Sequence, residues 1–157
     1  PESGSSVYIR QAGEGHQADI IQTGEHSASV EQTGNGNIVG VEQQGSNEHQ
    51  SSFSEEFGSG AFALLMQHGI GNEIMLAQNG SHYAEITQNG SQNTANVMQD
   101  GLDLGHLARI EQDGSGNDAT IEQYGSQNSA VIRQNGNGHS AHITQTGHGN
   151  SATVVQQ

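Results

Sequence analysis

The chain has 157 residues, 17 of them acidic and 3 basic, so its formal net charge is -14 at pH 7. This charge excludes binding to a nucleic-acid backbone as a default function, because that interaction needs a basic surface. No apolar stretch approaches the roughly 20 residues of a membrane-spanning helix, and the absence of cysteine excludes disulfides and thiolate chemistry. Only 30 % of the residues are hydrophobic, against about 45–50 % in ordinary globular domains, so composition alone would indicate disorder.

The first six residues, 1–6, form a polar N-terminal stub that precedes any regular pattern. The stub resembles the remainder of a chain from which a leader has been removed, so we expect export by a signal peptide that is not present in this chain. From residue 7 to residue 157 the sequence is a series of repeats, and we expect one repeat domain over that range.

The repeat is built on a glutamine that is followed two residues later by a glycine, with most steps between glutamines 11 residues long. The glutamines are Gln11, Gln22, Gln32, Gln43, Gln67, Gln78, Gln88, Gln99, Gln112, Gln123, Gln134, Gln145 and Gln156. The turn glycines are Gly13, Gly24, Gly34, Gly45, Gly58, Gly69, Gly80, Gly90, Gly101, Gly114, Gly125, Gly136 and Gly147. A short fixed period is typical of supersecondary units that stack along one axis.

Each glutamine is preceded, at four and two residues before it, by two apolar positions that are usually alanine and then a larger aliphatic residue. The expected core is Ala18, Ile20, Ala28, Val30, Val39, Val41, Ala63, Leu65, Ile74, Leu76, Ala84, Ile86, Ala95, Val97, Ala108, Ile110, Ala119, Ile121, Ala130, Ile132, Ala141, Ile143, Ala152 and Val154. Six residues before the glutamine the sequence often has asparagine, at Asn37, Asn72, Asn93, Asn117, Asn128 and Asn150. This alternation predicts a strand of about seven residues with Asn, Ala, Ile and Gln on one face, followed by a glycine-containing turn.

One unit departs from this pattern, at residues 46–56, which have no Ala/Ile pair and carry Glu55 and Glu56 where the glutamine is expected. We expect a looser coil or a bulged turn there. In the regular units every charged residue falls on an outward or turn position, which supports the register. These residues are Asp19, Glu31, Glu42, Glu73, Glu85, Arg109, Glu111, Asp118, Glu122 and Arg133.

Strands of this length joined by short turns fit an antiparallel meander or a flat solenoid whose alternate units form two parallel sheets. A meander would leave its Ala/Ile face in need of a second layer, whereas the two sheets of a solenoid cover each other. We therefore favour an all-β, two-sheet β-solenoid of about seven strand–turn–strand coils. Inward amides would be costly if unpaired, but in stacked coils each can bond the identical amide above and below. We expect the glutamines and asparagines to form such structural ladders.

The ends of the chain predict self-association. The first strand begins close to the N-terminus and the last ends at the C-terminus, with no helix, internal proline or charged cover over either. Open edges of one repeat favour end-to-end addition, and a heterologous interface that does not close gives a filament. We expect the coils to stack as a cross-β amyloid fibre.

The repeats resemble those of the curlin repeat family, the subunits of bacterial curli fibres. The family pattern S-x5-Q-x-G-x-x-N-x-A-x3-Q is matched by residues 123–134, and equally by 112–123 and 145–156. The resemblance implies an extracellular structural subunit of a biofilm amyloid fibre at the cell surface, with the Gln and Asn residues in stacking ladders. It also implies a nucleator subunit and an outer-membrane secretion pore as partners besides the chain itself. The acidic composition looks more like a major than a minor subunit.

Other functions remain open at this stage, namely a minor or nucleator subunit, or a monomeric solenoid that binds ice or another ligand. An enzyme is disfavoured because the chain has no H-E-x-x-H motif, no G-x-S-x-G motif and no clustered carboxylate pair, so we predict neither catalysis nor a cofactor. The histidines, including His139, His142 and His148, are expected to occupy turns or the asparagine position, with weak metal binding as the alternative.

Overall fold

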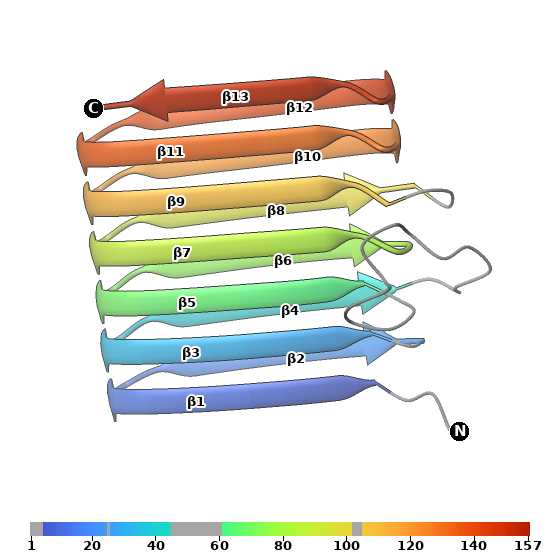
Figure 1. The fold of residues 1–157 in the computed structure, drawn as a ribbon. Helices are drawn as coiled ribbons and strands as arrows, with labels where there is room; N and C mark the ends of the chain where they lie inside the picture. The colour runs from blue at the N-terminus through green and yellow to red at the C-terminus, as the bar shows by residue number, and fades with distance from the viewer. Residues whose placement is uncertain (1–4, 25, 45–60, 102–104) are drawn as a thin grey trace.

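The computed structural model describes residues 5–24, 26–44, 61–101 and 105–157, and within these residues it contains thirteen β-strands and no helix (Figure 1). The strands are β1 (Ser6–Glu14), β2 (Gln17–Thr23), β3 (Ser27–Asn35), β4 (Ile38–Gln44), β5 (Phe62–Ile70), β6 (Glu73–Asn79), β7 (Tyr83–Ser91), β8 (Thr94–Asp100), β9 (Leu107–Ser115), β10 (Asp118–Ser126), β11 (Ser129–Asn137), β12 (Ser140–His148) and β13 (Ser151–Gln156). The described residues therefore include no helix that is long and apolar enough to cross a membrane.

Consecutive strands alternate between two parallel sheets, which lie one behind the other in Figure 1. The seven-stranded sheet has the order β1-β3-β5-β7-β9-β11-β13, and the six-stranded sheet has the order β2-β4-β6-β8-β10-β12. Each repeat position lies opposite its equivalent in the next coil, so that Gln11 pairs with Gln32 and Gly13 with Gly34. The predicted all-β, two-sheet solenoid is thus confirmed. Its thirteen described strands make six complete coils and one further strand, in place of fourteen half-units.

The pairing of the strands before and after residues 45–60 gives one strand fewer than expected among the described residues. In the seven-stranded sheet β3 pairs directly with β5, and in the six-stranded sheet β4 pairs directly with β6. The register therefore advances by 35 residues from Gln32 to Gln67, compared with 21 from Gln11 to Gln32. The looser coil expected at residues 46–56 lies outside the described residues.

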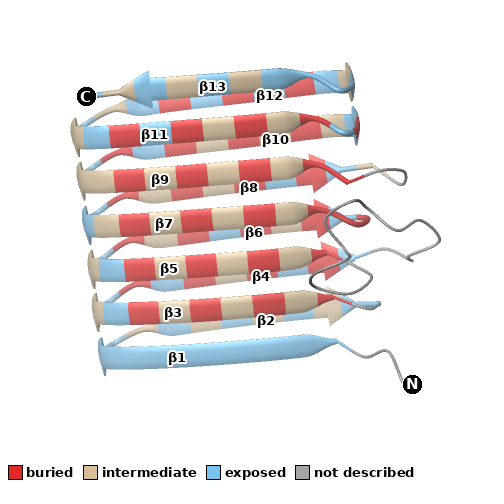
Figure 2. Ribbon diagram, in the orientation of Figure 1, coloured by how far each residue is buried: buried red, intermediate tan, exposed pale blue. Residues whose placement is uncertain are grey.

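The core is a thin layer between the two sheets, and Figure 2 shows its alternation along each strand. In β7 the inward Ala84, Ile86 and Gln88 are buried, whereas the residues between them are partly exposed. Of the aliphatic residues expected in the core, all are buried except Ala18, Ile20, Ala152 and Val154, which are partly buried. These four residues belong to strands at the two ends of the stack. They are only partly buried because no further coil covers them.

The turns stack as closely as the strands, and this requires glycine. Gly34 has a φ of 115°, in the region that favours glycine, and a Cβ built on it would lie 1.9 Å from the carbonyl oxygen of Gly69 in the next coil. Gly13, Gly69, Gly90 and Gly114 make the same approach to the next coil, so these glycines are fixed by the contact between coils as well as by the bend of their own chain.

Candidate assembly site: ladders, corners and open edges

The inward glutamines form two continuous ladders of side-chain hydrogen bonds. In the seven-stranded sheet Gln11 Nε2 donates to Gln32 Oε1 at 2.7 Å. The ladder continues through Gln67, Gln88, Gln112 and Gln134 to Gln156. The ladder of the six-stranded sheet runs from Gln22 through Gln43, Gln78, Gln99 and Gln123 to Gln145. Every donor–acceptor distance in the two ladders is between 2.7 and 3.0 Å.

A second hydrogen bond fixes the direction of each ladder. Gln88 Nε2, which donates to Gln112 Oε1 at 2.8 Å, also donates to the backbone carbonyl of Glu73 in the opposite sheet at 3.0 Å. A carbonyl only accepts, so the amide nitrogen must face it and the amide oxygen must face the coil below. Within the described residues no buried side-chain nitrogen or oxygen atom lacks a partner, which makes the polar part of this core compatible with burial.

The asparagines are organised differently from the expected amide-to-amide ladder. Asn93 Nδ2 donates to the carbonyl oxygens of Asn89 and Gly114, and its Oδ1 accepts the backbone N–H of Asn117 at 3.0 Å. The side chain of asparagine is one methylene shorter than that of glutamine and sits where the chain turns, so it reaches backbone groups rather than its counterpart. These residues form a side-chain-to-backbone ladder at the corner of the solenoid.

Histidine replaces asparagine at several positions of these corners. His82 Nε2 donates to the carbonyl oxygen of Asn79 at 2.8 Å, and its Nδ1 accepts the backbone N–H of His106 at 3.1 Å. His106 repeats the arrangement with Asp100 and Asn128. A backbone N–H can only donate and a carbonyl can only accept, so each ring is neutral with its proton on Nε2. Nδ1 thus takes the role of asparagine Oδ1, and Nε2 that of Nδ2.

Two of these corner histidines lie directly against each other. The rings of His82 and His106 stack with centroids 4.7 Å apart and an interplanar angle of 18°. Burial lowers the pKa of His82 to about 4, and burial also lowers the pKa of His106. A proton on Nδ1 would face the donor N–H of the next coil, so geometry and burial both favour the neutral ring.

The sequence predicted turns or the asparagine position for the histidines, without deciding between the two for His26 and His82. His26 is also a corner residue, because its Nδ1 accepts the backbone N–H of Ala61 at 3.1 Å. The signal was present in the sequence, since His26 and His82 stand six residues before Gln32 and Gln88. In the described part of the chain no group of three or more His, Cys, Asp or Glu side chains is arranged to hold a metal ion.

The outer faces of the two sheets differ in charge. All three arginines of the chain lie on the seven-stranded sheet, and each pairs with a glutamate of an adjacent strand. The pairs are Arg10–Glu31 at 3.1 Å, Arg109–Glu85 at 3.6 Å and Arg133–Glu111 at 3.3 Å. On the six-stranded sheet Asp19, Glu42 and Glu122 line a shallow hollow of about 390 Å³ with Met75 and Met98.

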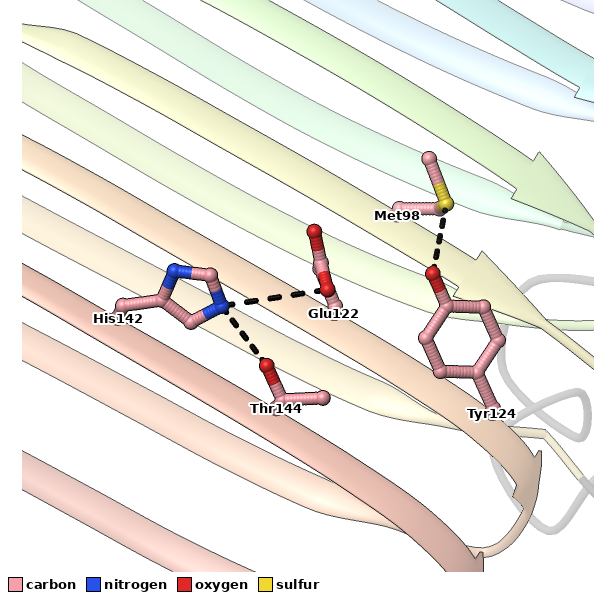
Figure 3. A network of polar contacts seen from close by, with 5 residues as sticks. All are labelled: Met98, Glu122, Tyr124, His142 and Thr144. Atoms are coloured by element: carbon pink, nitrogen blue, oxygen red, sulfur yellow. Dashed lines mark hydrogen bonds and ion pairs between the residues drawn. The ribbon is translucent and has the colours of Figure 1, made fainter.

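Near the C-terminal end of the six-stranded sheet the outward side chains form a small polar network (Figure 3). His142 Nε2 lies 2.7 Å from Thr144 Oγ1 and 3.9 Å from Glu122 Oε2. Tyr124 donates its hydroxyl to the sulfur of Met98 at 3.3 Å. The contacts of His142 with Glu122 and of Tyr124 with Met98 link neighbouring strands on the outer surface.

The two ends of the stack are complementary in their free hydrogen-bonding groups. At one end, Gln11 Oε1 and Gln22 Oε1 accept no hydrogen bond from the described residues. At the other end, Gln145 and Gln156 each donate to one backbone carbonyl, which leaves one amide proton of each without an acceptor among those residues. The inward Val7 and Ile9 of β1 are 49 % and 45 % exposed, so apolar core surface lies open at the same end.

A comparison with protein families agrees with this repeat geometry. The family model described as curlin associated repeat matches residues 105–125 and 125–157. The C-terminal part of the chain therefore carries two curlin repeats. The matched residues span 105–157, or 53 of 157, and contain β9 to β13. The curlin repeat family is structural and non-enzymatic, and its members are components of extracellular curli fibres. A search of curated proteins gives no match to the chain.

Proposed function

We propose that this chain is a structural subunit of an extracellular, curli-like amyloid fibre of a bacterial biofilm matrix, and that it assembles by end-to-end strand addition. In such a fibre the solenoid axis is the fibre axis. At each junction the two edge strands of one copy pair with the two edge strands of the next. The family match supports the class of protein. The resemblance also implies a nucleator subunit and an outer-membrane secretion pore as partners.

The observation that carries the proposal is the complementarity of the two open ends. The donor amides of Gln145 and Gln156 at one end correspond in position to the acceptor oxygens of Gln11 and Gln22 at the other. Stacking two copies in this sense continues both ladders, pairs the free backbone groups of the edge strands and covers Val7 and Ile9. Stacking with like ends together would place donor against donor.

A pair of matched lysine variants tests whether the open end is the growth surface. Ile9 points inward on the edge strand β1 and is 45 % exposed, and Ile38 points outward on β4 and is 42 % exposed. Ile9→Lys places a charge that a free monomer can keep in solvent but that a junction would bury. Ile38→Lys adds the same charge at similar exposure on an outer face.

Fibre growth is measured from wild-type seeds at neutral pH, by electron microscopy and by loss of soluble protein. We expect Ile38→Lys to elongate wild-type seeds at close to the wild-type rate and Ile9→Lys to elongate them at least tenfold more slowly. Circular dichroism of the soluble variants checks that both monomers keep their β-structure. Equal elongation by the two variants would contradict the proposal that the β1 edge is buried during growth.

A further inference from the structure

The number of strands constrains how two copies can meet. The described chain contributes seven strands to one sheet and six to the other. If a second copy is placed above the first without rotation, its β1 pairs with β13 and continues the seven-stranded sheet. The six-stranded sheet is then one strand short at every junction, and the facing edges of β12 and of the second copy's β2 are left unpaired.

We propose that successive copies in the fibre are related by a half-turn about the fibre axis, so that the two sheets exchange at every junction. This inference rests on the proposed function, since it describes the junction of that fibre. The second copy's β1 then pairs with β12, and its β2 pairs with β13. Strands run in opposite directions in the two sheets (Figure 1), and a half-turn preserves this arrangement and keeps every pairing parallel. Each of the two sheets of the fibre then receives seven strands from one copy and six from the next, or thirteen for every two copies.

The lengths of the edge strands agree with this exchange. β12 has 9 residues and β1 has 9 residues, whereas β13 has 6 and β2 has 7. The half-turn therefore pairs long with long and short with short. The unrotated arrangement would place the 9 residues of β1 on the 6 residues of β13 and leave the long edge of β12 without a partner.

The turns at the junction agree as well. Near the end of β12 and just after it stand Gly147 and Gly149, with φ of 108° and 67°, and β1 has Gly13 and Gly15 in the same places, with φ of 131° and 69°. Both pairs stand two and four residues after the ladder glutamine. A Cβ on Gly147 would meet only Asn150 Nδ2, at 3.7 Å, because no coil lies above it. Under the half-turn the second copy's Gly13 occupies that space, as Gly34 lies on Gly13 within the chain.

The side chains brought together at the junction are compatible in type. On the inward face the half-turn places Gln145 on Gln11 and Gln156 on Gln22, so both ladders continue with a donor below an acceptor. On the outward face it places the polar His148 on the polar Glu14, and Val155 on Ile21, which are 57 % and 55 % exposed in the single chain. The unrotated arrangement instead places Val155 on the charged Arg10.

Cysteine cross-linking distinguishes the two junctions, and the chain contains no native cysteine. Three single variants are prepared, Arg10→Cys, Thr144→Cys and Val155→Cys, all at outward positions immediately before a ladder glutamine. Mixed fibres of Arg10→Cys and Thr144→Cys bring the two sulfurs onto adjacent strands under the half-turn, at a Cα separation of about 4.8 Å that a disulfide spans. Mixed fibres of Arg10→Cys and Val155→Cys do so only in the unrotated arrangement, since the half-turn puts these residues on opposite faces.

A variant with Thr87→Cys and Glu111→Cys in one chain calibrates the oxidation, because these residues are opposite each other in β7 and β9. We expect dimers from the Arg10→Cys and Thr144→Cys mixture at a yield at least fivefold above that of the Arg10→Cys and Val155→Cys mixture. The reverse ratio, or fibres in which neither mixture cross-links although the calibration pair does, would overturn the half-turn. Absence of fibres from the wild-type chain would instead overturn the proposed function.

The helical symmetry of wild-type fibres gives a second test that needs no substitution. With a half-turn, each copy advances the fibre by six and a half strand spacings, or about 31 Å, with a rotation of about 180° modified by the sheet twist. Without it, each copy advances seven spacings, or about 34 Å, with only the twist. Cryo-electron microscopy that finds the longer rise without the half-turn would overturn the inference while leaving the fibre itself established.

Discussion

The glutamine ladders and the corner ladders both satisfy buried polar side chains, but they differ in which residue types they accept. In the ladders every position, from Gln11 to Gln156 and from Gln22 to Gln145, is glutamine, because each amide bonds the amide above it and only an identical side chain offers both groups at the right height. In the corners both asparagine and histidine occur, because each bonds the backbone of the next coil. Backbone groups are present whatever the residue, so a corner needs only one acceptor and one donor of suitable reach.

This comparison predicts that the largest loss of stability follows from removing a ladder glutamine. Gln112→Ala leaves Gln88 Nε2 without its acceptor, Gln134 Oε1 without its donor, and a cavity where the amide was. We expect the free energy of unfolding of the monomer to fall by about 3 kcal/mol, measured by urea denaturation. Thr33→Ala, an exposed position on β3, serves as control and should change it by less than about 0.5 kcal/mol. A loss as small for Gln112→Ala would contradict the ladder interpretation.

The corner histidines predict a dependence of stability on pH that the glutamines lack. The pKa of His82 is lowered by burial from 6.5 to about 4, so the unfolded chain takes up a proton at a higher pH than the folded chain. Stability from this residue is therefore complete above pH 6.5 and decreases as the pH falls toward 4. Between pH 7 and pH 5 we expect a loss of about 2 kcal/mol from His82.

The matched variant for this effect is His82→Asn, which offers the same donor and acceptor without a titrating group. Urea denaturation of both proteins at pH 7 and pH 5 isolates the histidine contribution, since changes from the carboxylates are common to the two. If the free energy of unfolding falls by the same amount in the wild type and in His82→Asn over this pH range, protonation of His82 is not coupled to folding.

A smaller effect is expected from exchange within a corner at neutral pH. His106→Asn should change the free energy of unfolding by less than about 1 kcal/mol. The reason is that Asn128 and Asn93, at equivalent corner positions, already make the same contact with the backbone of the next coil. Gln112→Asn makes the analogous exchange in a ladder, where the shortened side chain reaches neither neighbour, and should cost about twice as much or more. Similar losses for the two exchanges would remove the distinction between ladder and corner.

The smallest effect is expected on the outer face. Arg109→Ala removes the pair with Glu85, whose nitrogen and oxygen are 3.6 Å apart and whose side chains are 42 % and 24 % exposed. Solvent screens such a pair, so we expect less than about 0.5 kcal/mol at moderate salt. A loss that approaches that of Gln112→Ala would mean that surface pairing, rather than the inward ladders, holds the coils together.

The sequence was sufficient to predict the solenoid because its period carries the geometry directly. Apolar residues at positions four and two before Gln88 can both be inward only in a strand, and identical positions can stack only if the strands are parallel. The charged residues of the regular units all fall on outward or turn positions, which independently supported the predicted register. Residues 46–56 lack the Ala/Ile pair and were counted as a half-unit from the spacing alone, whereas β4 pairs directly with β6.

The corner chemistry was harder to predict because it depends on what a short side chain reaches at a turn. Asn93 stands on the inward face by periodicity, and the pattern therefore indicated a second amide ladder. Only the path of the chain brings the carbonyl oxygen of Gly114 and the N–H of Asn117 within its reach. The same path explains why His82 fits an asparagine position, which a comparison of residue types alone does not suggest.

X-ray fibre diffraction of the purified chain, after quiescent incubation at neutral pH and alignment of the product, tests the central claim most directly. If copies add end to end along the solenoid axis, the strands lie across the fibre, and a meridional reflection near 4.7 Å and an equatorial reflection near 10 Å are expected. A chain that stays monomeric over days at micromolar concentration, or fibres without the 4.7 Å meridional reflection, would contradict the account.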